Sequence, residues 1–193
     1  MTLLLQYSES APEQLLGQAK TIPDITSALA ALGVRFERWN ASQELPDDSS
    51  AESILAAYAS DIGRLKTERG YRTADVVRLK RDAQDAQWSA KAQAARGKFL
   101  DEHTHSEDEV RFFVEGSGMF CLHLQGKVTL VVCERGDLLS VPAGTRHWFD
   151  MGTEPAFCAI RVFGNETGWA AAFTGDKLAS DFPSFDAVKQ QYL

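Results

Sequence analysis

Apolar side chains recur at helical spacing in the first half of the chain. Residues 51–65 place one every three or four positions after a serine-rich acidic segment, and residues 25–32 do so over a shorter length. Residues 84–96 are rich in alanine, glutamine and lysine, whereas residues 34–39 alternate like a half-buried strand. We therefore predict a mostly helical region over residues 1–97. Glycine readily adopts the left-handed backbone of a helix end. The predicted helices end at Gly33, Gly70 and Gly97.

From residue 98 the pattern changes to short runs rich in β-branched, aromatic and leucine residues. Segments with glycine, proline or charged residues separate the runs, and no helical pattern lies between them. Short strands at such spacing indicate an antiparallel sandwich or barrel, with a jelly roll as the leading candidate. We predict a β-barrel core over residues 98–163. The predicted strands are residues 110–114, 118–124, 128–133, 138–141 and 156–163.

The last segment, residues 164–193, is predicted to be a tail that packs back on the barrel. The chain contains no repeat, flexible linker or low-complexity segment, so residues 1–193 are predicted to form a single domain. The tail residues expected to make this contact are the aromatic side chains of Trp169, Phe173, Phe182 and Phe185.

Composition and charge limit the partners of the chain. Its 193 residues carry a formal net charge of −7, and a chain without a basic surplus is not expected to bind nucleic acid or an anionic membrane. No apolar run approaches a membrane span, and the N-terminus lacks the pattern of a secretory signal. Three widely spaced cysteines indicate reduced, buried thiols. We expect a cytoplasmic protein and, in the absence of heptad repeats, a monomer.

Three of the four histidines lie where they could bind a metal ion. His103 and His105 are two residues apart, and Glu109 keeps the same parity, so one strand would direct all three to one face. His147 follows a turn that could bring a second strand across the first. Three imidazoles and a carboxylate suit a first-row metal such as iron, nickel, cobalt, manganese or zinc better than magnesium or calcium. His123 has no ligand-type neighbour in sequence and is expected to be a hydrogen-bonded strand residue.

The segments around these residues resemble the two motifs of the cupin superfamily. The first motif is matched without a gap from Gly97 to Gly116, and the second from Gly136 to His147. Met151 stands where the second motif usually ends in asparagine, at a position that binds no metal. The resemblance implies a cupin double-stranded β-helix, a jelly-roll barrel, with one metal ion.

The flanking segments are similar to those of the acireductone dioxygenase family of bacterial methionine salvage. The similarity extends over nearly the whole chain and includes GVRFERW, FLDEHTHSEDEVRFFVEGSGMF and VPAGTRHWFDMG. It implies cleavage of acireductone, 1,2-dihydroxy-3-keto-5-methylthiopentene, by dioxygen with Fe²⁺ or Ni²⁺ bound, one ion per monomer. With iron the implied products are formate and 4-methylthio-2-oxobutanoate; with nickel they are formate, carbon monoxide and 3-(methylthio)propanoate.

Further side chains border the predicted site. Arg111 keeps the parity of Glu109 and should face the barrel interior, and the resemblance implies a role in generating the substrate dianion. The resemblance also implies that Glu102 assists metal loading and that Asp108 relays conformational change. Either carboxylate could instead accept a hydrogen bond from a ligand imidazole, or be solvated. The candidate substrate-pocket residues are Phe99, Trp148, Phe149 and Arg161, although the three aromatic side chains could equally be core and Arg161 could pair with a carboxylate.

Two other classes of protein share some of these features. Another metal-dependent cupin enzyme, such as a sugar isomerase or a different dioxygenase, would have the same ligands with other flanking segments. The isomerase would act without dioxygen and with zinc. A non-enzymatic cupin that binds a small molecule would be expected to lack some ligands, and all four are present here.

Overall fold

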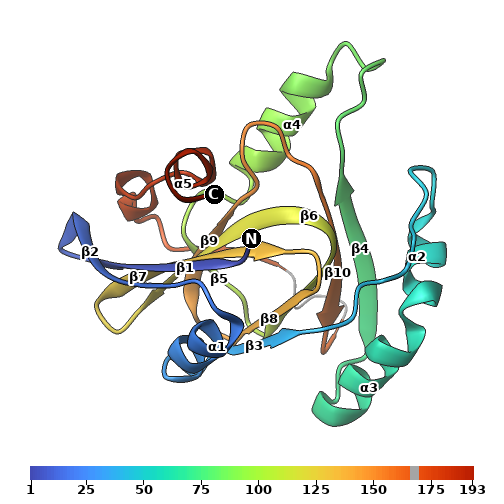
Figure 1. Ribbon diagram of the computed structural model, residues 1–193, viewed down its shortest axis with the longest axis horizontal. Coiled ribbons are helices and arrows are strands. Elements are labelled where there is room, and N and C mark those ends of the chain that lie inside the picture. The colour runs from blue at the N-terminus through green and yellow to red at the C-terminus, as the bar shows by residue number, and fades with distance from the viewer. Residues whose placement is uncertain (166–169) are drawn as a thin grey trace.

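The computed structural model describes residues 1–165 and 170–193, and its strands form two antiparallel sheets (Figure 1). The strands are β1 (Leu3–Ser8), β2 (Ala11–Ala19), β3 (Arg35–Arg38), β4 (Thr73–Leu79), β5 (His103–Thr104), β6 (Glu109–Leu124), β7 (Lys127–Glu134), β8 (Asp137–Val141), β9 (Arg146–Asp150), β10 (Phe157–Phe163) and β11 (Ala172–Phe173). The first sheet has the order β2-β1-β7-β6-β9-β5-β11 and the second the order β3-β8-β6-β10-β4. Strand β6 belongs to both sheets and joins them into the predicted jelly-roll barrel.

Strand β6 changes sheets at Gly116. Its first half pairs with β8 and β10, and its second half pairs with β7 and β9. Gly116 has a φ of +63°, and a Cβ atom there would lie 1.8 Å from the carbonyl oxygen of Ala156, so the bend requires glycine. The sequence predicted two strands separated by EGSG. One bent strand forms instead. At these residues the strand changes its pairing partners, but the chain does not reverse its direction.

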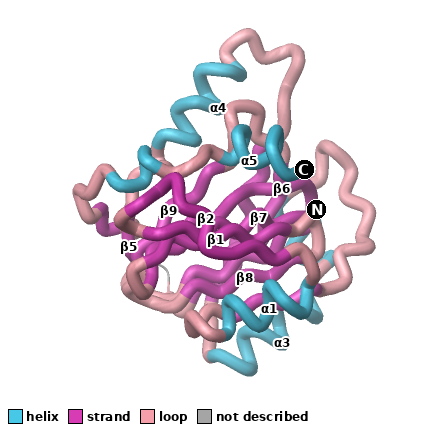
Figure 2. Tube along the Cα trace, turned by 60° about the vertical axis from the view of Figure 1, so that its left-hand side comes forward, coloured by secondary structure: helices cyan, strands magenta, loops and turns pink. Residues whose placement is uncertain are grey.

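Helices cover the outer faces of both sheets (Figures 1 and 2). Apolar residues of α2 and α3 pack on the second sheet, and those of α5 pack on the first sheet. Successive strand residues are buried on opposite faces. Phe113 belongs to the cluster between the sheets, whereas Phe112 faces outward and contacts the ring of Tyr58. The helices are α1 (Ile22–Ala30), α2 (Ala51–Ala57), α3 (Ala59–Arg69), α4 (Trp88–Gly97), the 3₁₀ helix η1 (Leu178–Asp181) and α5 (Phe185–Tyr192).

The N-terminal region contains more strand than the sequence predicted. Strands β1 and β2 extend the first sheet, and β3 and β4 are part of the second, so the barrel is not confined to residues 98–163. The run LLLQYS of β1 lacks simple alternation because both of its faces are buried. Leu4 lies in the cluster between the sheets, and Leu3 and Leu5 lie in the outer cluster under α5.

The predicted helices form with different limits. Residues 51–65 lie in α2 and α3, which meet at Tyr58, and Gly70 ends α3 with a left-handed φ of 74°. Helix α1 begins earlier than predicted because a threonine precedes it as the N-cap. Helix α4 begins only at Trp88, and Gly97 is its last residue rather than the residue that follows it.

The C-terminal segment returns to the outer face of the first sheet. Phe182 and Phe185 are buried there in the cluster that includes Tyr7. Phe173 is 58% exposed, and Trp169 lies outside the described residues. Among the described residues, no helix is both long enough and apolar enough to cross a membrane.

Candidate metal centre

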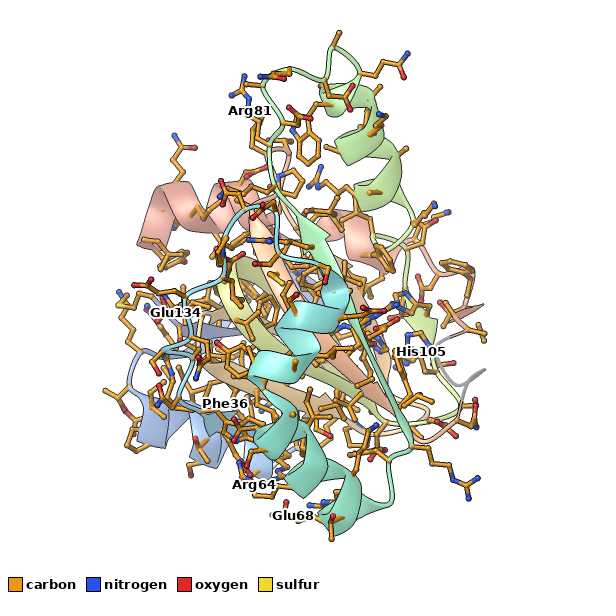
Figure 3. All side chains as sticks on the ribbon, turned by 90° about the vertical axis from the view of Figure 1, so that its right-hand side faces the viewer. Phe36, Arg64, Glu68, Arg81, His105 and Glu134 are labelled. Atoms are coloured by element: carbon orange, nitrogen blue, oxygen red, sulfur yellow. The ribbon has the colours of Figure 1, made fainter. Side chains whose placement is uncertain are left out.

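Three adjacent segments bring the predicted ligands together inside the barrel. His147 on β9 pairs in register with His103 on β5, and Glu109 is the first residue of β6. The expected single strand carrying the first three ligands does not form, because β5 has two residues and the chain bends at residues 106–107 before β6. His105 directly precedes this bend, on the side of the barrel opposite Glu134 (Figure 3). The ligands therefore converge because the chain turns from β5 into β6.

The four side chains surround one point. One candidate ligand atom from each of them lies within 4.8 Å of the other three. Oε2 of Glu109 is 2.6 Å from Nε2 of His147 and 3.2 Å from Nε2 of His105. The ring centroid of His103 is 4.6 Å from that of His147 and 5.1 Å from that of His105. All four are largely buried, with the His105 side chain 10% exposed.

Backbone carbonyl groups orient all three imidazole rings. Nδ1 lies 2.8 Å from the Asp101 oxygen in His103 and 2.8 Å from the Thr145 oxygen in His147. In His105 the partner is the oxygen of Ala170, at 3.2 Å. A carbonyl oxygen can only accept, so each Nδ1 carries the proton and donates it. Each Nε2 then keeps a free lone pair for a metal ion.

Charge at the centre favours a bound cation. Burial raises the pKa of the Glu109 carboxyl, but Arg111 and two imidazoles outweigh burial and hold this pKa well below its ordinary value. Nη2 of Arg111 is 2.5 Å from Oε1 of Glu109. Burial lowers the pKa of His103, which favours the neutral imidazole that binds metals. Burial has the same effect on His147, but its contact with Glu109 is stronger and raises its pKa.

The donor set fits a divalent first-row transition metal. Three neutral imidazole nitrogens and one carboxylate oxygen are intermediate ligands of the kind that iron, nickel, cobalt, manganese and zinc share. Backbone carbonyls hold Nδ1 of the rings, and Glu109 is ionised. A bound cation would replace any proton on Nε2 of His147, whose pKa Glu109 raises. Four protein ligands on an octahedral ion leave two positions for a substrate.

A cavity of about 600 Å³ adjoins the centre. Its wall includes three of the four ligands and four of the other predicted residues, Phe99, Arg111, Phe149 and Arg161. A cavity of this size with mostly apolar walls and a few polar groups at one place is typical of a small-molecule site. The remaining wall residues are Asp75, Val77, Lys98, Phe113, Met151, Phe157, Ala159, Ala171 and Phe173.

Arg161 both lines the cavity and pairs with a carboxylate, the two interpretations that the sequence left open. It lines the cavity, and its Nε donates to Oδ1 of Asp75 at 2.6 Å, with a second contact from Nη2 to Oδ2. Arg161 also pairs in register with Arg111 on β6. Nη1 of Arg111 is buried and has no hydrogen-bond partner among the described residues. The cavity wall therefore contains a guanidinium group with one unpaired, buried nitrogen.

Neither Glu102 nor Asp108 accepts a hydrogen bond from a ligand imidazole, and Glu102 is buried rather than solvated, so these predictions were wrong. Oε2 of the buried Glu102 is 2.5 Å from Nδ1 of His123, and its Oε1 accepts from Thr174 at 2.9 Å. Asp108 instead accepts from the hydroxyl group of Tyr71 at 3.0 Å and from a backbone N–H group. His123 is hydrogen-bonded, as the sequence predicted.

Trp148 does not line the cavity. It is buried in the outer cluster of the first sheet, where its ring packs 6.0 Å from that of Phe182. Alternation along β9 explains this result, because His147 and Phe149 face the barrel interior and the residue between them must face outward. The sequence prediction of Trp148 as a pocket residue was therefore wrong.

Several cavity residues escaped the sequence prediction. Asp75 and Val77 lie on β4, which is absent from the predicted strands although TADVVRL contains a β-rich run. Ala159 shares a strand face with Arg161, and this parity was a usable signal. Phe173 lies edge-on to the ring of His103, with a centroid separation of 5.7 Å. The sequence predicted that Phe173 packs on the barrel, but not that it lies beside a ligand of the metal centre.

The barrel and its three-histidine, one-glutamate cluster together define a metal-binding cupin. The chain is 56% identical to the acireductone dioxygenase of Pseudomonas paraeruginosa over 95% of its length and 98% of that protein. It is 50% identical to the enzyme of Yersinia enterocolitica over 96% of its length and all of that protein. The structure is similar to acireductone dioxygenase from Bacillus anthracis with cadmium ion in its active centre. The TM-score is 0.75 at 28% identity, covering 90% of this chain and 98% of that one.

A sequence profile of the ARD/ARD′ family matches residues 4–171. The chain therefore belongs to the acireductone dioxygenase family, a family of metal-dependent dioxygenases.

Proposed function

We propose that this protein cleaves acireductone with dioxygen at the cluster of His103, His105, Glu109 and His147. The observation that carries the proposal is the cluster itself, placed beside Arg111 in the wall of a cavity. Identity of 50–56% to acireductone dioxygenases over nearly the full chain supports the same substrate. The cluster would hold one Fe²⁺ or Ni²⁺ ion per monomer.

The bound metal would supply a Lewis acid that holds the oxygens of the enediol. Arg111 stabilises the dianion of the substrate, because its guanidinium group lines the cavity and its Nη1 has no hydrogen-bond partner among the described residues. Burying this anion without a cation would be costly. Phe99 and Phe149 exclude water from the reacting carbons and contact the apolar part of the substrate.

We assign the two neighbouring carboxylates the roles that family resemblance implies. Glu102 is buried next to His103 in sequence and bonds to His123 and Thr174, which supports an influence on metal loading. Asp108 accepts a hydrogen bond from the backbone of Ala143, so it connects the segments that precede two ligands. This link supports a role in transmitting conformational change between them.

The products depend on the metal. With iron, both atoms of dioxygen enter formate and 4-methylthio-2-oxobutanoate, the precursor of methionine in its salvage. With nickel, the products are formate, 3-(methylthio)propanoate and carbon monoxide. In both reactions the atoms of acireductone and one dioxygen molecule equal those of the products, so no further reductant is needed.

We further propose that residues 1–193 act as a single cupin domain and a cytoplasmic monomer that binds neither nucleic acid nor membranes. The net charge of −7 supports the absence of nucleic-acid and anionic-membrane binding. Light scattering on the metal-loaded protein should give the monomer mass of 21.3 kDa.

The function is tested by turnover of synthetic acireductone in air, using apoprotein loaded separately with iron(II) and nickel(II). Formate from both forms, with carbon monoxide from the nickel form alone, is the expected result. Absence of oxygen uptake by protein shown to contain either metal would overturn the substrate. Zinc-loaded protein that converts a sugar without oxygen would favour the isomerase class.

A further inference from the structure

The wall of the cavity formed by β4, β10 and β6 is ordered in rows of residues that pair across the strands. Asp75, Arg161 and Arg111 form one row, because β10 pairs residue 161 with each of the other two. The next row away from Glu109 is Val77, Ala159 and Phe113. All six side chains line the cavity. The wall therefore changes from charged to apolar within one row.

The apolar part of this wall is longer than the tail of the proposed substrate. Phe157, which also lines the cavity, lies four residues before Arg161 on β10, and this separation corresponds to about 13 Å along a strand. The methylthioethyl tail of acireductone contains three single bonds beyond its first carbon and spans at most about 4.5 Å. A cavity of about 600 Å³ is also in the range that holds much larger ligands.

Ala159 is the small side chain in the middle of this apolar wall. It is 1% exposed and lies between Val77 and Phe113 in register. Met151, a flexible side chain that can adapt to different shapes, also lines the cavity. A larger side chain at residue 159 would project into the cavity between the charged row and Phe157.

We propose that the cavity accepts acireductones with straight apolar tails longer than methylthioethyl, and that Ala159 determines the longest tail that fits. The inference rests on the proposed function and names a wider substrate class for the same site. The tail takes no part in the reaction. One dioxygen molecule again cleaves the enediol carbons to formate and a 2-oxo acid, which retains the longer tail.

The first test is the affinity of the metal-loaded wild-type protein for a series of alkyl acireductones, measured by calorimetry without oxygen so that no cleavage occurs. Each methylene that enters the apolar part should strengthen binding up to about fourfold, the factor expected for a buried methylene. Turnover of the same series is then measured in air. Longer tails should raise kcat/KM, because KM falls while kcat stays nearly constant. Affinity that falls from the first added methylene onward would overturn the proposal.

The second test compares Ala159→Leu with Ala156→Leu. Residue 156 is exposed just before β10, so the second variant adds the same bulk outside the cavity and should behave as wild type throughout. Ala159→Leu should weaken binding of the longest tails by at least 30-fold more than it weakens binding of the methylthio substrate. An equal effect on short and long tails would contradict the role of Ala159. If Ala159→Leu does not fold, Ala159→Val should also weaken binding of the longest tails more than binding of the methylthio substrate, but by a smaller factor.

Failure of this proposal is distinguishable from failure of the proposed function. If the protein turns over methylthio acireductone but rejects longer tails, the function stands and the tail proposal fails. If it turns over none of them, the function itself is wrong.

Discussion

Two buried groups of histidine and glutamate lie on opposite faces of the first sheet, and they differ in what their nitrogen atoms contact. In the first group, the Nε2 atoms of His105 and His147 lie near Oε2 of Glu109. In the second group, Nδ1 of His123 contacts Glu102, and its Nε2 lies 3.1 Å from Oε1 of Glu9. Both groups contain a short contact between an imidazole and a carboxylate.

The difference between the groups lies in which atoms remain available. In the first group, backbone carbonyls take every Nδ1, so the Nε2 atoms converge beside a cavity. In the second group, carboxylates and the Arg146 guanidinium surround both nitrogens of His123. Buried histidine and glutamate side chains therefore form a metal site only when several free lone pairs point at one accessible position.

The largest expected effect separates the two groups by metal content. His147→Ala removes one of four ligands and should weaken metal binding by more than about 100-fold, since even groups that only support ligands contribute 10- to 100-fold. His123→Gln is the matched control, a buried histidine on the neighbouring strand that should leave metal content unchanged. Elemental analysis after dialysis measures both. Full metal content in His147→Ala would contradict the assignment of the ligands.

Arg111 provides the next largest effect, on turnover rather than on metal content. Arg111→Ala removes the cation beside the reacting anion and should lower kcat/KM about 100- to 1000-fold, as loss of one such donor does elsewhere. Metal content should stay at the wild-type level. Arg111→Lys keeps the charge and should recover part of the activity. Unchanged kinetics in the alanine variant would show that Arg111 is structural.

Substitutions in the second group should lower the stability of the protein, whereas substitutions in the first group should lower metal binding. His123→Leu leaves the buried Glu102 carboxylate without its imidazole partner and should lower the free energy of unfolding by about 3–5 kcal/mol. Urea denaturation of the metal-free protein measures this. The double variant His123→Leu/Glu102→Met replaces the pair with apolar groups and should recover most of the loss. A double variant no more stable than the single one would mean that His123 acts through other contacts.

Glu102→Gln gives the smallest expected effect. The amide can still bond to His123 and Thr174, so the unfolding free energy should fall by only about 1 kcal/mol. Equilibrium affinity for the metal should stay within about threefold of wild type, whereas metal uptake should be slower if Glu102 assists loading. Stopped-flow mixing with nickel(II) measures the uptake rate. A tenfold loss of equilibrium affinity would instead place Glu102 within the centre.

The ligands and the barrel could be predicted from residue types and spacing, although the expected single strand carrying the first three ligands does not form. Residues 103, 105, 109 and 147 were named from their pattern, and the structure brings all four together. Side chains alternate along β9, so this pattern also distinguishes Phe149, which faces the cavity, from Trp148, which faces outward.

The remaining contacts depend on segments far apart in the chain. Asp75 reaches Arg161 across 86 positions, and Thr174 reaches Glu102 across 72. Strand β1 was not predicted because helices and a second sheet bury both of its faces, which removes the alternation that marks a half-buried strand. Such features follow from packing, and no local pattern encodes them.

The unequal lengths of the strands that carry the ligands have a consequence for hydrogen exchange. Glu109 begins a sixteen-residue strand, and His147 lies on a strand that is paired on both sides, so their amide protons should exchange slowly. His103 belongs to a two-residue strand, and His105 directly follows that strand. Local opening of that short segment would withdraw two ligands at once while the other two stay fixed. We therefore expect the amide protons of residues 103–105 to exchange faster than those around Glu109 and His147.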